Sequence, residues 1–117
     1  MGVEVMNEIK EYVDGIYKAL DDKKAEDIAI IDISGLSNIA DYFVIATAGN
    51  PHQMDALQDA VDEYMVRAGK PAKNIEGRVR DKSNWILMDY GDIIVHIFDK
   101  EAREFYNLEH LWKGIES

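Results

Sequence analysis

The sequence contains no cysteine, only two prolines and no long apolar run. Without cysteine there are no disulfides, no thiolate metal sites and no thiol catalysis, and a reducing compartment is the natural location. A membrane span needs roughly 18 consecutive apolar residues, and no run approaches that length. The first five residues include an acid where a signal peptide carries basic charge. These absences predict a cytoplasmic protein that does not enter a membrane.

Basic charge is also scarce, because 13 Lys and Arg face 23 Asp and Glu, which gives a net charge of −10. Such a chain repels phosphate backbones, so binding to bare nucleic acid is disfavoured. Residues 70–82 are an exception with a local excess of basic charge. The basic residues there are Lys70, Lys73, Arg78, Arg80 and Lys82. We interpret them as a solvated loop and strand edge, and the alternative is an anchor for an anionic surface.

The composition is otherwise that of a globular protein, with 47% apolar and 31% charged residues. The length of 117 residues predicts a single domain over residues 1–117. Apolar residues at helical spacing predict a helix over residues 5–20. A second helix is expected to begin at Asn50 and Pro51, which suit its cap and its first turn, and to end before Gly69.

The strand-forming segments are rich in β-branched and aromatic residues. They are residues 27–33, 42–47, about 74–80, and two runs within 85–98. Asp99 is expected to cap a last helix, from residue 100 to about 106. The resulting order, α-β-β-α-β-β-β-α, predicts an α/β fold of the α+β type. Its mixed sheet of about five strands has helices mainly on one face.

The two runs within 85–98 flank the turn residues Tyr90, Gly91 and Asp92 and predict a tight hairpin. If Gly91 and Asp92 are the central turn residues, alternation puts two sets of side chains on opposite faces. The first set, assigned to the helix-covered core, is Ile86, Met88, Tyr90, Ile93, Val95 and Ile97. The second is Trp85, Leu87, Asp89, Ile94, His96 and Phe98. A register error of one residue exchanges the two faces.

The second set mixes large apolar groups with an acid and a histidine, which is typical of an interface. The alternative is that the C-terminal segment, Leu108 to Trp112, folds over this face. Trp85 is the expected hot spot, and Asp89 with Asp92 is expected to steer a basic partner. We interpret His96 as a hydrogen-bonded sheet histidine rather than a base or metal ligand, because no second histidine lies at ligand spacing.

Several segments together resemble the ribosomal silencing factor family, also called Iojap-related proteins. The resemblance runs from residue 6 to residue 113. It rests on residues 21–28, 41–45, 76–77 and 85–98, on Arg103, and on residues 106–112. Residues 48–51, Ala-Gly-Asn-Pro, depart from the glycine-rich turn ending in serine that is usual in the family. Pro51 still suits a helix start.

The resemblance implies binding to the large ribosomal subunit through its protein number fourteen, at the surface where the small subunit docks. Subunit joining is then blocked, and translation slows when nutrients are scarce. The implied fold is similar to that of nucleotidyltransferases. The implied partner contacts fall on Trp85, Asp89, Tyr90 and Phe98. The resemblance also implies a homodimer when free, and the basic residues of 70–82 become candidates for a minor contact with ribosomal RNA.

Two alternatives remain at this point, and the first is a nucleotidyltransferase-fold enzyme. Such an enzyme needs carboxylates that converge on magnesium, usually an Asp-x-Asp pair, and the chain has no such pair. No serine lies in a Gly-x-Ser-x-Gly elbow either. We therefore predict no catalysis, no metal and no cofactor. The second alternative is a homodimeric ribosome assembly factor.

Overall fold

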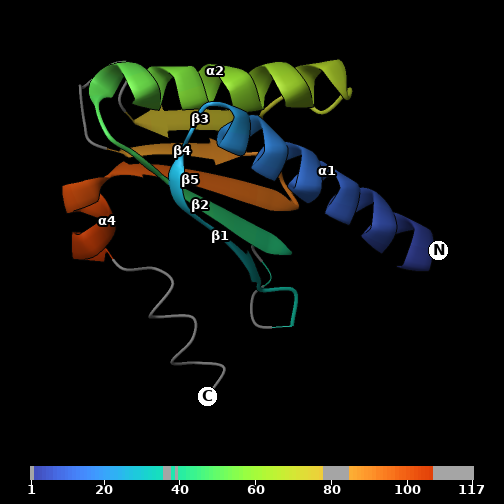
Figure 1. Ribbon diagram of the computed structural model, residues 1–117. Helices are drawn as coiled ribbons and strands as arrows, with labels where there is room; N and C mark the ends of the chain where they lie inside the picture. The colour runs from blue at the N-terminus through green and yellow to red at the C-terminus, as the bar shows by residue number, and fades with distance from the viewer. Residues whose placement is uncertain (1, 36–37, 39, 78–84, 107–117) are drawn as a thin grey trace.

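The computed structural model describes residues 2–35, 38, 40–77 and 85–106. These residues form three helices and five strands (Figure 1). In chain order they are α1 (Gly2–Asp22), β1 (Glu26–Asp32), β2 (Tyr42–Ala48), α2 (Pro51–Arg67), β3 (Asn74–Gly77), β4 (Trp85–Asp89), β5 (Ile93–Asp99) and α4 (Lys100–Tyr106). The strand predicted over 74–80 ends at Gly77, and residues 78–80 lie outside the described residues.

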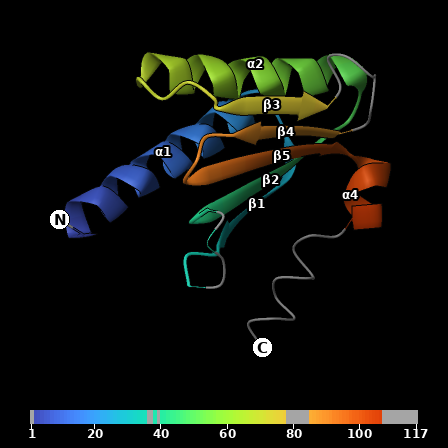
Figure 2. The ribbon, with the colours of Figure 1, turned by 180° about the vertical axis from the view of Figure 1, so that it is seen from behind.

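The strands form one sheet in the order β1-β2-β5-β4-β3. The pair β2–β5 is parallel, and the other three pairs are antiparallel. β1 and β3 are therefore the two edges, and both can be followed in the view from behind (Figure 2). This arrangement confirms the predicted mixed sheet, while the likeness to nucleotidyltransferases stays a prediction.

The hairpin has the predicted register, with Trp85 opposite Phe98 and Met88 opposite Val95. The turn closes where the Tyr90 N–H donates to the Ile93 carbonyl over 2.9 Å. Gly91 lies at φ 89°, a conformation that glycine adopts without strain. The turn chemistry thus fixes which side chains face the helices.

Helices α1 and α2 pack on one face of the sheet and build the main core (Figure 1). All six hairpin residues assigned to the core belong to it, and they are at most 7% exposed. α1 contributes Ile9, Val13, Ile16 and Leu20, and α2 contributes Met54, Leu57, Val61 and Met65. The helix spacing and the strand alternation therefore converge on one apolar layer.

The ends of α2 follow the sequence prediction. The Asn50 side chain accepts a hydrogen bond from the Gln53 N–H over 2.8 Å, and Pro51 opens the helix. Beyond the helix, Gly69 lies at φ 80°. Its N–H donates to the Val66 carbonyl over 3.0 Å, and the next N–H donates to the Met65 carbonyl over 2.8 Å. These two bonds are the Schellman pattern that ends a helix.

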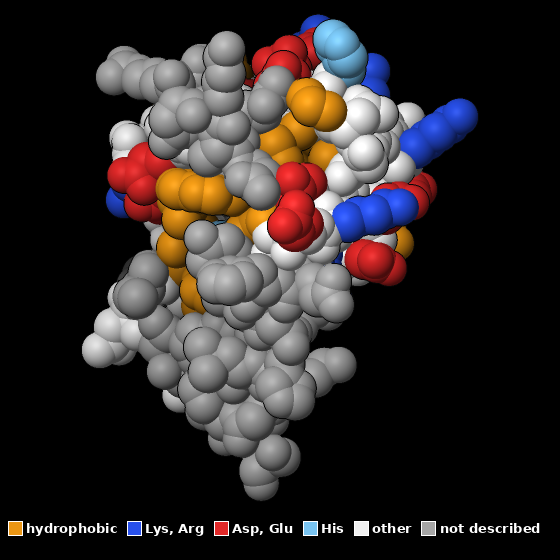
Figure 3. Space-filling view, turned by 90° about the vertical axis from the view of Figure 1, so that its left-hand side faces the viewer, with side chains coloured by type: hydrophobic (Ala, Val, Ile, Leu, Met, Phe, Trp, Pro, Cys, Tyr) orange, Lys and Arg blue, Asp and Glu red, His pale blue; other side chains and the backbone are white. Residues whose placement is uncertain are grey.

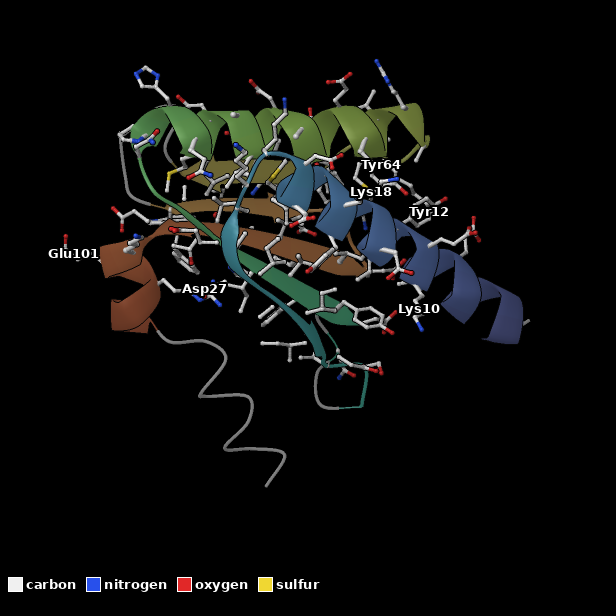
Figure 4. All side chains as sticks on the ribbon, in the orientation of Figure 1. Lys10, Tyr12, Lys18, Asp27, Tyr64 and Glu101 are labelled. Atoms are coloured by element: carbon white, nitrogen blue, oxygen red, sulfur yellow. The ribbon has the colours of Figure 1, made fainter. Side chains whose placement is uncertain are left out.

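Tyr64 of α2 is half-buried, whereas Met54, Leu57, Val61 and Met65 of the same helix are fully buried. Its ring lies against Gly15 of α1, where an added Cβ would meet the Tyr64 ring and hydroxyl at 2.0 Å. Figure 4 shows Tyr12 and Tyr64 where α1 and α2 meet. The missing side chain of Gly15 therefore opens a place for the tyrosine between the two helices.

Helix α4 lies on the opposite face of the sheet and covers only one end of it (Figures 1 and 2). Its Ala102 packs with Ile45 and Phe98 in a small cluster. The Asp99 carboxylate accepts a hydrogen bond from the Ala102 N–H over 2.7 Å, which confirms the predicted cap. The helices thus lie mainly on one face, as expected. Among the described residues, no helix is both long and apolar enough to cross a membrane.

Candidate protein-binding surface

The face of the sheet opposite α1 and α2 is called the far face here. Its hairpin side chains come from alternate positions of β4 and β5, and their neighbours come from β2. They are Phe43, Ile45, Trp85, Leu87, Asp89, Ile94, His96 and Phe98. The structure therefore brings Trp85, Asp89, His96 and Phe98 onto one surface, as the alternation predicts.

Trp85 and Leu87 are half-buried, so each keeps part of its apolar surface accessible. Trp85 stands opposite Phe98 and packs against the cluster of Ile45, Phe98 and Ala102. Figure 3 shows hydrophobic side chains between acidic ones at the α4 end of the molecule. A large aromatic side chain that packs on a buried cluster and keeps part of its surface exposed to solvent has the properties of an interface anchor.

Phe98 is not an open surface residue, because it is only 5% exposed. α4 follows β5 directly and places Ala102 in one buried cluster with Phe98 and Ile45. Strand alternation predicts which face of the sheet a side chain lies on, but it does not predict that the next helix buries that side chain. Phe98 therefore supports Trp85 from within, and direct contact of Phe98 with a partner stays a prediction.

His96 lies at the centre of the far face between two phenylalanines. Its ring meets Phe43 edge-on with centroids 5.0 Å apart, and it stacks on Phe98 at 6.0 Å. Burial lowers the pKa of His96 to about 4, so the ring is neutral at neutral pH. Its Nε2 is buried without a hydrogen-bond partner among the described residues. The expectation of a hydrogen-bonded histidine is thus wrong for this nitrogen, and the ring behaves as a third member of an aromatic row.

The two acids of the hairpin differ in their surroundings. The Asp89 side chain accepts a hydrogen bond from the Gly91 N–H over 2.8 Å, and its carbonyl accepts one from the Lys73 N–H over 2.7 Å. Asp92 is exposed, and its carbonyl accepts from the N–H groups of Asp41 and Tyr42. Asp89 therefore has a clear role in shaping the turn, while the Asp92 carboxylate is available to a partner.

Tyr90 lies on the helix side of the sheet, as alternation predicts, and it is 7% exposed. Its hydroxyl donates to the Asp62 carboxylate of α2 over 3.2 Å. Burial, together with this neighbouring carboxylate, raises the pKa of Tyr90. The structure therefore does not bring Tyr90 together with Trp85. Tyr90 ties the hairpin to α2.

The basic segment is only partly described. The Lys70 ammonium lies 5.7 Å from the centroid of the Tyr12 ring, a cation–π contact within the protein. Lys73 is exposed beside Gly91 at the hairpin turn. Arg78, Arg80 and Lys82, and the segment Leu108 to Trp112, lie outside the described residues.

Sequence reasoning missed the way α4 is attached to the sheet. The Arg103 guanidinium donates to the Thr47 hydroxyl over 2.8 Å, and Thr47 is 1% exposed. The Lys100 Nζ lies 3.5 Å from the Glu26 Oε2 of β1, which is an ion pair. Thr47 was the signal in the sequence, because a hydroxyl buried in an apolar strand requires a hydrogen-bond partner from another element. Within the described residues, no group of three or more His, Cys, Asp or Glu could hold a metal ion.

Comparisons with known proteins agree on one family. The family described as "Ribosomal silencing factor during starvation" matches residues 6–117. A Bacillus subtilis protein named Ribosomal silencing factor RsfS is 42% identical over 94 residues, which covers 80% of this chain and 78% of that protein. The family match spans the whole hairpin, α2, and α1 from residue 6 onward.

Two more distant comparisons extend the likeness. A crystal structure of a protein from Chromobacterium violaceum has a TM-score of 0.84 and 31% identity, and covers 90% of this chain and 86% of that one. A mouse protein named "Mitochondrial assembly of ribosomal large subunit protein 1" is 30% identical over 107 residues. That match covers 86% of this chain and 44% of the mouse protein.

Proposed function

This chain belongs to the ribosomal silencing factor family, and from that premise we propose that it represses translation by occupying the large ribosomal subunit. The partner in this proposal is ribosomal protein number fourteen, at the surface where the small subunit docks. A bound copy then blocks subunit joining by steric exclusion. The starvation context in the family's description supports an action that is useful when nutrients are scarce.

The observation that carries this proposal is the half-buried Trp85 beside Leu87 on the far face. α1 and α2, the two long helices, both pack on the other side of the sheet. Aromatic anchors in the centre of an interface typically contribute about 2 kcal/mol or more to binding. The aromatic row of Phe43, His96 and Phe98 holds the sheet surface next to Trp85 rigid, so little ordering is required on binding.

Charge supports a protein partner with a basic surface. The chain carries a net charge of −10, and Asp92 is exposed at the hairpin turn. Opposite charges on two partners raise the association rate and fix the orientation of docking. We expect Asp92 to contribute more to this steering than Asp89, whose carboxylate already accepts a bond from Gly91. Exposed Lys73 is the described residue best placed for a minor contact with ribosomal RNA.

The proposal predicts inhibition by occupancy rather than turnover. Inhibition of subunit joining, followed by light scattering, should saturate near one protein per large subunit. Subunits that have already joined should be inhibited less, because the small subunit then covers the same surface. Full inhibition at far fewer copies than subunits would indicate turnover and would favour an enzyme.

A second candidate function is assistance in large-subunit assembly, which the printed name of the mouse relative favours. The same surface serves both functions, since an assembly factor on the joining face also keeps small subunits away. The two functions differ in the particle that is bound most tightly. An assembly factor binds immature large subunits more tightly than mature ones, whereas a silencing factor binds the mature particle at least as well. A free homodimer closed through the far face is compatible with either function.

A further inference from the structure

The outer edge of β1 is a second surface with the properties of a binding site. β1 is the first strand of the sheet and, among the described strands, pairs only with β2. The Ile33 N–H donates to the Asp41 carbonyl over 2.8 Å, so the backbone of residue 33 faces β2. In an antiparallel pair this orientation alternates, and the N–H and carbonyl of Ile30 and Asp32 therefore point away from β2. The edge thus offers unpaired strand hydrogen bonds.

The residues along this edge are apolar, whereas edge strands usually carry residues that prevent pairing with another chain. Residues 28–31 read Ile-Ala-Ile-Ile, and Ile30 is 41% exposed. Proteins protect sheet edges from pairing with lysine, proline, bulges or a covering element. β1 has a bulge between Glu26 and Ala29, where Asp27 lies at φ 47°, but residues 29–32 pair regularly with β2. The second half of the strand therefore pairs regularly with β2, and its residues 29–31 are apolar.

Charge selects the kind of chain that fits this edge. β1 carries Glu26, Asp27 and Asp32 and no basic residue. The Glu26 carboxylate lies 3.5 Å from the Lys100 ammonium. Asp32, at the other end of the strand, accepts hydrogen bonds from the Ser34 N–H and hydroxyl over 3.0 and 2.6 Å and stays anionic and exposed, and Asp27 is exposed as well. Figure 4 places Asp27 on β1, away from the junction of α1 and α2 at Tyr64. A second copy of β1 would bring acids against acids, and RNA would be repelled for the same reason.

We propose that the outer edge of β1 binds an extended, lysine- or arginine-bearing segment of another protein as an added strand. Backbone hydrogen bonds to Ile30 and Asp32 provide the affinity, and the acids at the strand ends select basic side chains. This inference is independent of the proposed function. β1 is separated from β4, which carries Trp85, by β2 and β5, so both surfaces can be occupied at once.

The first test uses a synthetic peptide of alternating lysine and valine and needs no ribosome. The ¹⁵N-labelled protein is titrated with this peptide at low salt, and backbone amide shifts are followed by NMR. We expect saturable shifts centred on Ile30 and Asp32. A peptide of the same sequence with alternate amides N-methylated keeps its charge but loses its strand hydrogen bonds, and should bind at least about tenfold more weakly. Equal binding of both peptides would mean simple charge attraction and would overturn the proposal.

The second test uses a matched pair of variants. Ile30→Lys places a positive charge at the edge, and Val66→Lys makes a similar change at a 52% exposed position on α2. Ile30→Lys should weaken peptide binding about tenfold or more, while Val66→Lys should change it less than about twofold. Circular dichroism of both variants checks folding. Equal losses in the two variants, or a salt-dependent dimer through β1 seen by sedimentation without peptide, would contradict the proposal.

Discussion

The two faces of the sheet share the same strands and differ in what covers them. On the helix face, Ile86, Met88, Val95 and Ile97 are fully buried. On the far face of the same hairpin, Trp85, Leu87 and His96 are half-buried. Since adjacent residues of one strand belong to opposite faces, the backbone cannot cause this difference. Among the described residues, two long helices cover one face, and the short α4 covers one end of the other.

This difference separates stability from recognition within one hairpin. The helix face is one large apolar cluster built from α1, α2, β2, β4 and β5, with Ile28 of β1 packed against it. The far face holds two smaller clusters, one around Ile33 and Phe43 and one around Ile45 and Phe98. Substitutions on the helix face should therefore change unfolding, and substitutions at the open positions of the far face should change binding.

The largest expected effect is the loss of a core side chain on the helix face. Ile97→Ala leaves a cavity at a fully buried position and should lower the free energy of unfolding by about 2–5 kcal/mol. Leu87→Ala, at a half-buried position of β4, should cost less than about half as much. Urea unfolding of both variants measures the two values. Equal costs would show that the two faces contribute equally to stability.

The second prediction concerns pH and His96, whose Nε2 is buried. Its pKa is about 4 in the folded protein and near 6.5 when unfolded, so the unfolded state takes up a proton first as the pH falls. His96 therefore permits full stability above about pH 6.5 and destabilises the fold progressively as the pH falls to about 4, by roughly 2–3 kcal/mol. The measurement compares unfolding free energies of the wild type and His96→Gln across this range, because the carboxylate contributions cancel. Parallel pH curves would show that His96 is solvated.

The third prediction concerns binding. Trp85→Ala should weaken binding to purified large subunits at least about tenfold, since it removes the aromatic anchor of the far face. Tyr17→Ala, a truncation at a 42% exposed aromatic on α1, is the matched control and should leave binding unchanged. Co-sedimentation with large subunits measures both. If Trp85→Ala unfolds the protein instead, Trp85 belongs to the core and the far face is not open there.

The smallest effect is expected at Tyr90. Tyr90→Phe removes the hydroxyl that donates to Asp62 and should cost about 1 kcal/mol of stability. Because this tyrosine lies on the helix face, affinity for the large subunit should stay within about twofold of the wild type. A clear loss of affinity in the folded variant would show that Tyr90 contacts the partner and that residues of the helix face also contribute to binding.

Most of the fold could be predicted from local patterns. The hairpin register follows from the turn residues Gly91 and Asp92, and the start of α2 follows from Asn50 and Pro51. These features depend on neighbours a few residues away, where spacing, capping and turn chemistry are strong. The candidate surface was predicted only in part. Alternation placed Trp85, Asp89, His96 and Phe98 on one face but did not predict which of these side chains another element buries.

The sequence by itself determined the elements, their apolar faces and the acidic charge, because each is a property of residues close together in the chain. The tertiary structure alone decided that α4 buries Phe98, that Tyr90 bonds to Asp62, and that Ile30 lies on an open edge. These outcomes depend on contacts between segments far apart in the sequence and on the order of strands in the sheet. Local periodicity carries no information about either, since burial is set by whichever element packs on top.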